Sequence, residues 1–552
     1  MENINIAFER WCKNATADKD LALELEKIKS DNDKINDAFF KEMEFGTGGL
    51  RGKIGAGTNR MNVYTVARAT LGLANYIIRK NSGEKKVAIG YDTRIKSKLF
   101  AETTARVLSA KNITVFLFNR PLPTPALSFA VRELGCDAGI MITASHNPAI
   151  YNGYKVYGAD GCQITTKAAD EIYSEISKLD YFDSLPEKSG DRVNLVPEEV
   201  YEKFIASVNS LSISKNVDKS VSVVYTPLNG TGIEPVTDIL SRNDYEKVTV
   251  VAEQQSHDGN FPTCPFPNPE LPEAMELGLK YAKEKEADIL LATDPDCDRV
   301  GVAVKNQDGY KLLTGNEVGI LLFDYICHLK TKSGTMPQNP ICVKTIVTTS
   351  LAEKIAKAYG VEMVNVLTGF KFIGEKIGEL EAKGEKERYI FGFEESCGYL
   401  SGSHVRDKDG VNAALLICEM AAYYKKQGVS LANKLSELYE KYGYSLNKLL
   451  SYTFEGEVGM EKMQDFMKSM REAESTFGDF EILKVTDYSA GIDGLPKSDV
   501  LQFNLCDDCS VIIRPSGTEP KLKFYLFANG ETEAISKNKI EKLNSFIDKI
   551  VK

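Results

Sequence analysis

Short apolar runs alternate with longer amphipathic stretches along most of the chain, and this alternation predicts the fold. The runs Lys86–Gly90, Ile113–Phe118 and Ala138–Ile142 contain β-branched or aromatic residues, which is typical of buried strands. Apolar positions recur at helical spacing from Val66 to Lys80, before the first run, and from Lys96 to Ala110, between the first and second runs. This order predicts βαβ units and a largely parallel sheet.

The same pattern starts again twice further along the chain. Strands are predicted at Val221–Tyr225 and Ala287–Ala292, and then at Ile341–Ile346. After Tyr444 the pattern changes, because Val511–Arg514 and Leu522–Phe527 indicate paired strands followed by a terminal helix. The first 45 residues are different again, since they place apolar groups at helical spacing among charges and predict a helical extension.

The length of 552 residues is too great for one hydrophobic core, since a domain has roughly 150 residues. We predict an α/β protein of three consecutive α/β domains with mixed sheets and a smaller C-terminal α+β domain, around a central active-site cleft. The predicted ranges are 1–208, which includes the helical extension 1–45, then 209–318, 319–443 and 444–552.

Composition limits the class of protein. With 43% hydrophobic and 26% charged residues the chain is globular, and a net charge of −10 argues against general binding of nucleic acid or anionic membranes. No apolar run reaches membrane-spanning length and the N-terminus lacks a signal-peptide pattern, so we expect a cytoplasmic protein. The 11 cysteines are scattered, as expected of reduced thiols.

A serine follows the predicted strand Ala138–Ile142. It lies in Thr143-Ala-Ser-His-Asn-Pro148, where the Asn-Pro pair halts regular structure and predicts a loop that continues to Lys155. A serine hydroxyl is a poor nucleophile without an activating base or a polarised electrophile. His146 and Lys155 are the nearby candidates to assist Ser145.

Three aspartates follow the strand Ala287–Ala292. Asp294, Asp296 and Asp298 alternate in sequence, so their carboxylates can converge on one hard cation. Ligation by oxygen alone favours Mg²⁺. An EF-hand is excluded, because its sixth and twelfth positions require Gly and Glu and here hold Arg299 and Lys305.

Two later loops carry polar groups suited to a sugar phosphate. Glu394 and Ser396 offer a short acceptor and a short donor for sugar hydroxyls. The last loop supplies a guanidinium, two hydroxyls and a glycine amide, which together can hold a phosphate dianion. Its residues are Arg514, Ser516, Gly517 and Thr518.

These four loops, in this order, resemble the active site of the α-D-phosphohexomutases, the phosphoglucomutase and phosphomannomutase superfamily. The glycine-rich stretch Phe45–Gly52, followed by Asn59-Arg-Met-Asn62, looks most like the phosphoglucomutase-2-like branch. That stretch lacks the Gly-Lys-Ser/Thr ending of a phosphate-binding nucleotide loop, so we do not expect a nucleotide site.

The resemblance implies a reversible transfer of phosphate between glucose 1-phosphate and glucose 6-phosphate. It implies that Ser145 carries the phosphate and takes part in the Mg²⁺ site with the three aspartates. It also implies glucose 1,6-bisphosphate as intermediate and activator, and a place for Arg51 near the transfer centre. The substrate-binding residues that it implies are Arg299, Thr368, Gly369, Glu394, Ser396, Lys408, Arg514, Ser516, Gly517 and Thr518.

Other functions stay open. On the same fold, the enzyme can be a phosphomannomutase, a phosphopentomutase or a hexose-bisphosphate synthase. A phosphatase of the haloacid dehalogenase type, with Asp294 as nucleophile, is a remoter alternative that leaves Ser145 without a role. A sugar-phosphate-binding protein without activity is disfavoured, because the serine and the aspartates are all present. Small-molecule sugar phosphates are the expected partners, and the sequence does not decide between monomer and dimer.

Overall fold

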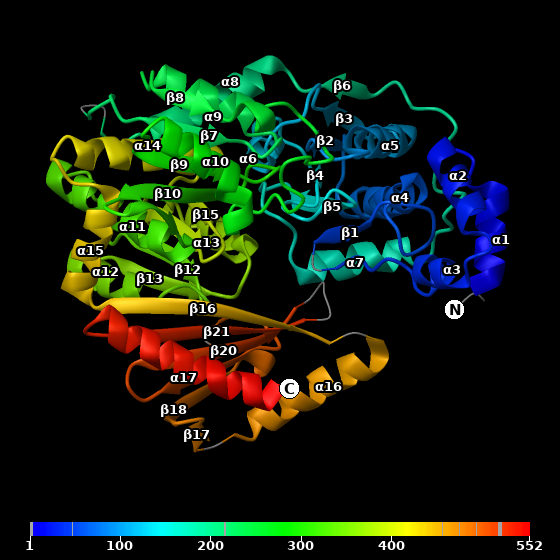
Figure 1. The fold of residues 1–552 in the computed structure, drawn as a ribbon. Coiled ribbons are helices and arrows are strands. Elements are labelled where there is room, and N and C mark those ends of the chain that lie inside the picture. Colours follow the sequence, from blue (N-terminus) through cyan, green and yellow to red (C-terminus); the bar gives the residue numbers. More distant parts are fainter. Residues whose placement is uncertain are drawn as a thin grey trace.

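The computed structural model describes residues 4–46, 48–214, 217–454, 456–473, 475–492, 494–516 and 521–551. Four sheets follow one another along the chain, and helices surround them (Figure 1). Each sheet lies within one of the four predicted ranges, whereas the limits between the domains stay a prediction. Among the described helices, we find none with the length and apolar character needed to cross a membrane.

Three helices precede the first sheet, as the sequence predicted. They are α1 (Ile4–Asn14), α2 (Lys19–Ile28) and α3 (Asn32–Phe39). Trp11 of α1 is almost fully buried, and its ring meets that of Tyr64 edge to face with the ring centres 5.6 Å apart. The extension is therefore held on the first domain by aromatic packing.

The first sheet is mixed, with strand order β1-β5-β4-β2-β3-β6. Strands β4, β2, β3 and β6 are parallel, whereas β5 is antiparallel to both β4 and β1. Its elements are β1 (Gly49–Lys53), α4 (Val63–Lys80), β2 (Lys86–Tyr91), α5 (Ser97–Ala110), β3 (Thr114–Leu117), α6 (Thr124–Glu133), β4 (Ala138–Ile142), β5 (Tyr151–Gly158), α7 (Thr166–Ile176), β6 (Val193–Leu195) and α8 (Glu198–Ser210).

The sequence predicted a loop as far as Lys155, and this prediction is wrong from Tyr151 onward. From Tyr151 the chain forms β5, in which Lys155 lies opposite Met141 of β4. This segment has no continuous apolar run, because its only valine, Val156, stands among Asn, Gly, Tyr and Lys residues. Backbone pairing on both sides, to β1 and to β4, makes it a strand all the same.

The second sheet has the order β11-β10-β9-β7-β8, and the third has the order β13-β12-β14-β15. In the second, β8, β7 and β9 are parallel and β10 is antiparallel to both β9 and β11. In the third, β13, β12 and β14 are parallel and β15 is antiparallel to β14. The elements of the second are β7 (Val223–Thr226), α9 (Ile233–Arg242), β8 (Val248–Val250), α10 (Pro272–Glu284), β9 (Ile289–Thr293), β10 (Val300–Asn306) and β11 (Gly309–Leu313). Those of the third are α11 (Gly315–Ser333), β12 (Ile341–Thr345), α12 (Leu351–Tyr359), β13 (Glu362–Val366), α13 (Phe370–Ala382), β14 (Tyr389–Glu394), β15 (Gly398–Leu400), α14 (Gly410–Lys425) and α15 (Leu431–Tyr442).

The C-terminal sheet is antiparallel, with the order β16-β21-β20-β19-β18-β17, and α17 packs on β16 and β21 (Figure 1). Its elements are β16 (Tyr444–Thr453), α16 (Gly456–Arg471), β17 (Thr476–Phe477), β18 (Phe480–Asp487), β19 (Leu501–Leu505), β20 (Cys509–Pro515), β21 (Lys521–Gly530) and α17 (Glu533–Val551). The predicted pairing of two strands after Val511 is confirmed, and so is the predicted fold class.

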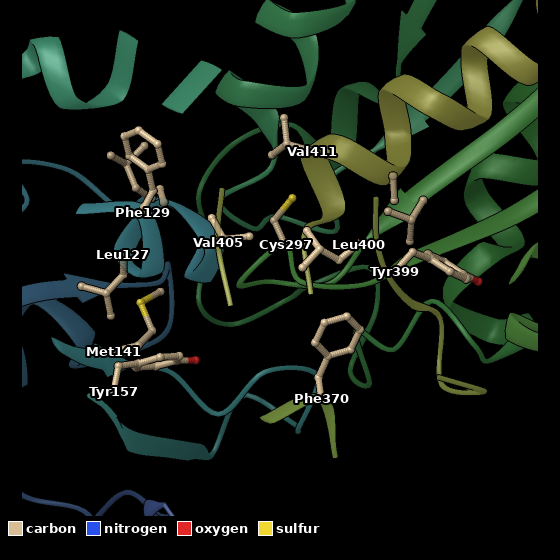
Figure 2. Packing of buried hydrophobic residues seen from close by; sticks show 14 of the residues in the cluster. Leu127, Phe129, Met141, Tyr157, Cys297, Phe370, Tyr399, Leu400, Val405 and Val411 are labelled. Carbon is tan, nitrogen blue, oxygen red and sulfur yellow. The ribbon is translucent and has the colours of Figure 1, made fainter. Parts of the chain in front are cut away.

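One hydrophobic core runs through the first three domains (Figure 2). Leu127 and Met141 come from the first, Cys297 from the second, and Leu400 and Val411 from the third. The C-terminal domain has its own core and meets the third through a smaller apolar cluster. The loops of the first three domains are therefore fixed relative to one another by packing.

Candidate active site

The predicted serine lies just beyond the end of β4 in a strained backbone conformation. Ser145 has a φ of 52° and is 4% exposed. Its hydroxyl donates to Asp294 Oδ2 at 2.9 Å and lies 3.2 Å from His146 Nδ1. A left-handed conformation in a residue other than glycine costs roughly 1–3 kcal/mol and is concentrated at functional sites.

A buried arginine that the sequence analysis missed holds this loop in place. The guanidinium of Arg94 is fully buried and lies 3.3 Å from the carboxylate of Asp92. It donates to four backbone carbonyls of the serine loop, those of Ser145, Asn147, Pro148 and Tyr151. The Asp-Thr-Arg sequence directly after the strand β2 was the available signal, since it places a charged pair at a strand end.

Arg94→Lys is expected to lower turnover at least tenfold. A single ammonium group cannot reach four carbonyls, and each lost hydrogen bond from a charged donor is worth roughly 1.5–3 kcal/mol. Steady-state kinetics and thermal unfolding of the variant measure the effect. Arg106→Lys, which changes a partly buried arginine of α5, is the control. Unchanged turnover at unchanged stability would show that Arg94 does not shape the loop.

The three aspartates converge as the sequence predicted. Asp294, Asp296 and Asp298 are all at most 1% exposed, and one carboxylate oxygen from each lies within 4.8 Å of the other two. Asp294 Oδ1 accepts the backbone N–H groups of Asp298, at 3.1 Å, and Arg299, at 3.0 Å, which folds the loop back on itself. In the described part of the chain, Asp296 Oδ1 and Asp298 Oδ1 are buried without a hydrogen-bond partner.

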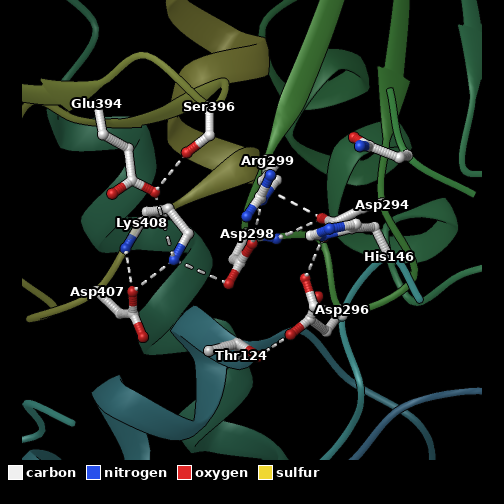
Figure 3. Close-up of polar contacts among 12 residues, drawn as sticks. Thr124, His146, Asp294, Asp296, Asp298, Arg299, Glu394, Ser396, Asp407 and Lys408 are labelled. Atoms are coloured by element: carbon white, nitrogen blue, oxygen red, sulfur yellow. Dashed lines mark hydrogen bonds and ion pairs between the residues drawn. The ribbon is translucent and has the colours of Figure 1, made fainter. Parts of the chain in front are cut away.

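Two lysines approach this cluster. Lys408 Nζ lies 3.1 Å from Asp298 Oδ2 (Figure 3). Lys155 Nζ lies 2.8 Å from Asp296 Oδ2 and 3.6 Å from Asp298 Oδ2. Burial opposes the charge of Lys155, but the two aspartates outweigh it and raise its pKa. Burial, and then the charges of its two neighbours, raise the pKa of Asp294 well above the usual range. Buried carboxylate oxygens without partners fit a hard divalent cation, because burying them unpaired is costly.

The predicted sugar-binding residues continue this network (Figure 3). Ser396 Oγ donates to Glu394 Oε1 at 3.1 Å, and Lys408 Nζ lies 4.0 Å from the same oxygen. Asp407, which the sequence analysis passed over, contacts Lys408 Nζ at 3.2 Å and accepts a 2.8 Å hydrogen bond from Tyr157 of β5. We call the segment of Glu394 and Ser396 the sugar loop and the segment from Asp294 to Asp298 the metal loop. Contacts of Lys408 and Asp407 therefore connect the sugar loop to both the metal loop and the first domain.

Arg299 and His146 also lie beside the aspartates (Figure 3). Arg299 Nη1 forms a 2.5 Å ion pair with Glu270, which precedes α10 and was also missed. Burial lowers the pKa of His146 well below its usual value, and the charges of Arg299 and Arg51 act in the same direction. A neutral imidazole beside Ser145 follows from this.

Three further predicted residues lie near this network. Arg51 is on β1, and its Nη1 donates to the side chain of Asn147 in the serine loop at 3.2 Å. Thr368 and Gly369 precede α13, whose first residue, Phe370, has its ring centre 5.7 Å from Lys408 Nζ. The Thr368 hydroxyl is buried without a hydrogen-bond partner among the described residues.

The predicted phosphate loop begins at the end of β20, which contains Arg514. Gly517 and Thr518 lie outside the described residues, whereas Arg514 and Ser516 are described. Within the described ranges, Arg514 Nε is buried and has no hydrogen-bond partner. Burial, and then Glu394, raise the pKa of Glu395 to about 7, while Arg514 acts in the opposite direction. The guanidinium therefore lies within electrostatic reach of the sugar loop.

Family models match most of the chain. The models of α/β/α domains I, II and III of phosphoglucomutase/phosphomannomutase match residues 42–182, 199–309 and 314–442. The helices α1 to α3 precede the first matched residue.

Complete proteins give the same result. A phosphoglucomutase of Staphylococcus saprophyticus is 36% identical over 512 residues, which cover 89% of this chain and 91% of that protein. One of Staphylococcus epidermidis is 37% identical over 502 residues, which cover 88% and 90%. A crystal structure of a Thermus thermophilus protein assigned as a phosphomannomutase has a TM-score of 0.71 at 22% identity, covering 93% and 99%, and shows the shared fold. The chain therefore belongs to the phosphoglucomutase/phosphomannomutase family of enzymes.

Proposed function

We propose that this enzyme is a phosphoglucomutase, which interconverts glucose 1-phosphate and glucose 6-phosphate. Its similarity to the two staphylococcal phosphoglucomutases over nine tenths of the chain supports this substrate. The observation that carries the proposal is the hydrogen bond between Ser145 and Asp294. It places a strained, buried hydroxyl inside a carboxylate cluster that fits a cation.

In this proposal Ser145 carries the phosphate between the two sugar positions. The bond between phosphorus and the Ser145 oxygen breaks, and a bond to the free hydroxyl of the bound monophosphate forms. The resulting glucose 1,6-bisphosphate turns within the enzyme and returns its other phosphate to Ser145. One serine then serves both sugar hydroxyls without net hydrolysis.

Lys155 is the proposed carrier of the proton. The transfer moves one proton from the sugar hydroxyl to the Ser145 oxygen. Lys155, which Asp296 and Asp298 keep protonated, gives a proton to the leaving serine oxygen and regains one from the attacking hydroxyl. His146 is neutral and within hydrogen-bond reach of Ser145, so it can orient the serine hydroxyl.

The residues that would hold Mg²⁺ are Asp294, Asp296, Asp298 and Ser145 with its phosphate. When bound, Mg²⁺ neutralises charge on the phosphoryl group and aligns it for transfer. Lys155 and Lys408 hold the far oxygens of Asp296 and Asp298, so the unpartnered oxygens stay available as ligands.

The remaining residues would bind the sugar phosphate. We propose that Glu394, Ser396 and Lys408 bind sugar hydroxyls. We also propose that Thr368 and Gly369 distinguish which face of the sugar is presented. Arg51 and Arg299 would flank the phosphate in transfer. The other phosphate would be held by the loop of Arg514, Ser516, Gly517 and Thr518 in both orientations of the substrate.

A substrate comparison tests the proposal. Turnover of glucose, mannose and ribose 1-phosphates would be measured with and without glucose 1,6-bisphosphate, together with release of free phosphate. We expect glucose 1-phosphate to give the highest kcat/KM and free phosphate to be negligible. A preference for mannose or ribose would replace the substrate by that of a phosphomannomutase or phosphopentomutase. Net hydrolysis would favour a phosphatase with Asp294 as nucleophile.

We also propose that the enzyme acts in the cytoplasm. The 11 cysteines are all present as free thiols, which suits a reducing compartment. Sugar phosphates are the proposed partners.

Arg514→Ala is expected to make the enzyme depend on added glucose 1,6-bisphosphate. Losing a charge-assisted hydrogen bond worth roughly 1.5–3 kcal/mol should lower kcat/KM about 10- to 100-fold. Weaker binding of the non-reacting phosphate also lets more glucose 1,6-bisphosphate dissociate before it turns in the site. Each dissociation leaves Ser145 without phosphate. Rates are measured against bisphosphate concentration.

Arg471→Ala is the matched control, because this arginine of the same domain pairs with Asp487 and Asp499 instead. Its activation curve should match that of the wild type. Superimposable curves for Arg514→Ala and the wild type would remove Arg514 from the phosphate site.

A further inference from the structure

Thr124 contacts the metal loop twice, although it lies in no motif recognised in the sequence. Its backbone N–H donates to the carbonyl oxygen of Asp296 at 2.9 Å, and its hydroxyl donates to Asp296 Oδ2, also at 2.9 Å (Figure 3). The residue is fully buried. One residue of the first domain thus holds both the backbone and the side chain of a residue in the second.

The local sequence makes Thr124 a rigid donor. It is the first residue of α6, between Pro123 and Pro125. The ring of each proline fixes its own φ, and Pro125 also restricts Thr124. The first N–H groups of a helix have no partner within the helix, so the N–H of Thr124 is available to Asp296.

The contact with Thr124 determines which carboxylate oxygen of Asp296 remains available to bind a cation. Oδ2 accepts from Thr124 and from Lys155 Nζ, which is 2.8 Å away, so this oxygen is engaged on two sides. Oδ1 is buried and has no partner in the described part of the chain, and Asp296 belongs to the group whose ligand atoms converge. Two fixed donors on one oxygen set the plane of the carboxylate and present the other oxygen.

The residue before Asp296 is held within its own domain. The carbonyl oxygen of Pro295 accepts from the backbone N–H of Thr231 at 2.8 Å and from its hydroxyl at 3.0 Å. A threonine from each of the two domains therefore contacts the metal loop. Of these two threonines, Thr124 is the one that donates to a carboxylate oxygen of the cluster.

We propose that Thr124 is a positioning residue that orients Asp296 for cation binding, so that the first domain completes a site formed by the second. This inference rests on the proposed function, since it assumes that the aspartates bind Mg²⁺. A partner of a metal ligand that fixes its orientation commonly contributes 10- to 100-fold to affinity or activity. Loss of the Thr124 hydroxyl should therefore weaken cation binding by about that factor.

The competing explanation is that Thr124 only joins the two domains. The backbone hydrogen bond to the Asp296 carbonyl serves that purpose, and it survives in Thr124→Val, Thr124→Ala and Thr124→Ser. Only the serine variant keeps a hydroxyl. If Thr124 only joins the two domains, all three variants should bind the cation with equal affinity.

The test measures Mn²⁺ and Mg²⁺ binding by calorimetry, on full-length dephosphorylated protein without substrate. Thr124→Val and Thr124→Ala should bind about 10- to 100-fold more weakly than the wild type, and Thr124→Ser should bind close to the wild type. Thr104→Val is the control, because its fully buried hydroxyl donates to the carbonyl oxygen of Phe100 in its own helix, α5. Thermal unfolding shows which variants are folded.

Each outcome decides the point. Weak binding by the folded alanine or valine variant, with rescue by serine, supports the inference. Binding within a factor of two in a folded variant without the hydroxyl overturns it, and so does failure of serine to restore affinity. If the wild type itself binds neither cation, the proposed metal site is wrong and the inference falls with it.

Discussion

Ser145→Ala is expected to lower glucose 1-phosphate turnover by about 10⁴-fold or more, because removal of a covalent nucleophile commonly has this effect. In the proposed mechanism the Ser145 hydroxyl carries the phosphate between the two sugar positions, and alanine has no group that can replace it. The substrate contacts proposed for Glu394, Lys408 and Arg514 are untouched by the change. We therefore expect binding of glucose 1-phosphate to be nearly unchanged while kcat collapses.

Intact-protein mass spectrometry completes the experiment. The wild type should carry one phosphate after incubation with glucose 1,6-bisphosphate, and the alanine variant should carry none. Ser109→Ala is the matched control, because Ser109 is equally buried and its hydroxyl accepts from the Gly190 backbone in the first domain. Near-normal turnover of Ser145→Ala, or phosphate on another residue of the wild type, would contradict the proposed role of Ser145.

The strands that end in site residues were predictable from the sequence. Ala138–Ile142 and Ala287–Ala292 are short apolar runs that stop at polar residues, so both the strand and the loop after it could be recognised. Loops at the ends of sheet strands are where open α/β folds place ligands. The association of Ser145 with the aspartates came instead from the family resemblance, because the two strands belong to different sheets.

The residues that position the site were not predictable in the same way. Thr124 and Arg94 act through contacts with segments 172 and about 50 residues away in the sequence. A threonine between prolines, or an arginine after a strand, does not reveal its partner. Such partners are set by how distant segments pack, within one domain for Arg94 and between two domains for Thr124, and no local pattern encodes this packing.

Phe393 is next to a predicted sugar-binding residue in the sequence, but its side chain belongs to the hydrophobic core. It precedes Glu394 on β14, yet it is fully buried, and its ring lies against Gly319 of α11. A methyl group added at Gly319 would lie 2.2 Å from this ring, so the glycine makes room for it. The aromatic side chain thus belongs to the core of the third domain.

Asp296→Asn is expected to lower kcat by about 10²- to 10³-fold, with a smaller change in KM for glucose 1-phosphate. The substitution keeps the shape of the side chain but removes one of three negative charges. An amide is also a poorer ligand for Mg²⁺ than a carboxylate, and its NH₂ group can face Lys155 donor to donor. Because the aspartates are proposed to act on the phosphate in transfer, the loss should fall on the chemical step.

Two further measurements separate this effect from a general loss of structure. Asp324→Asn changes a buried aspartate on α11, which contacts Tyr359 and Lys434 in the third domain, and it should keep the wild-type kcat. Excess chelator should abolish wild-type activity and added Mg²⁺ should restore it, whereas Asp296→Asn should need a higher Mg²⁺ concentration for its residual activity. If the wild type stays fully active in chelator, or if Asp296→Asn keeps the wild-type kcat, the aspartates do not bind the catalytic cation and the proposed mechanism must be abandoned.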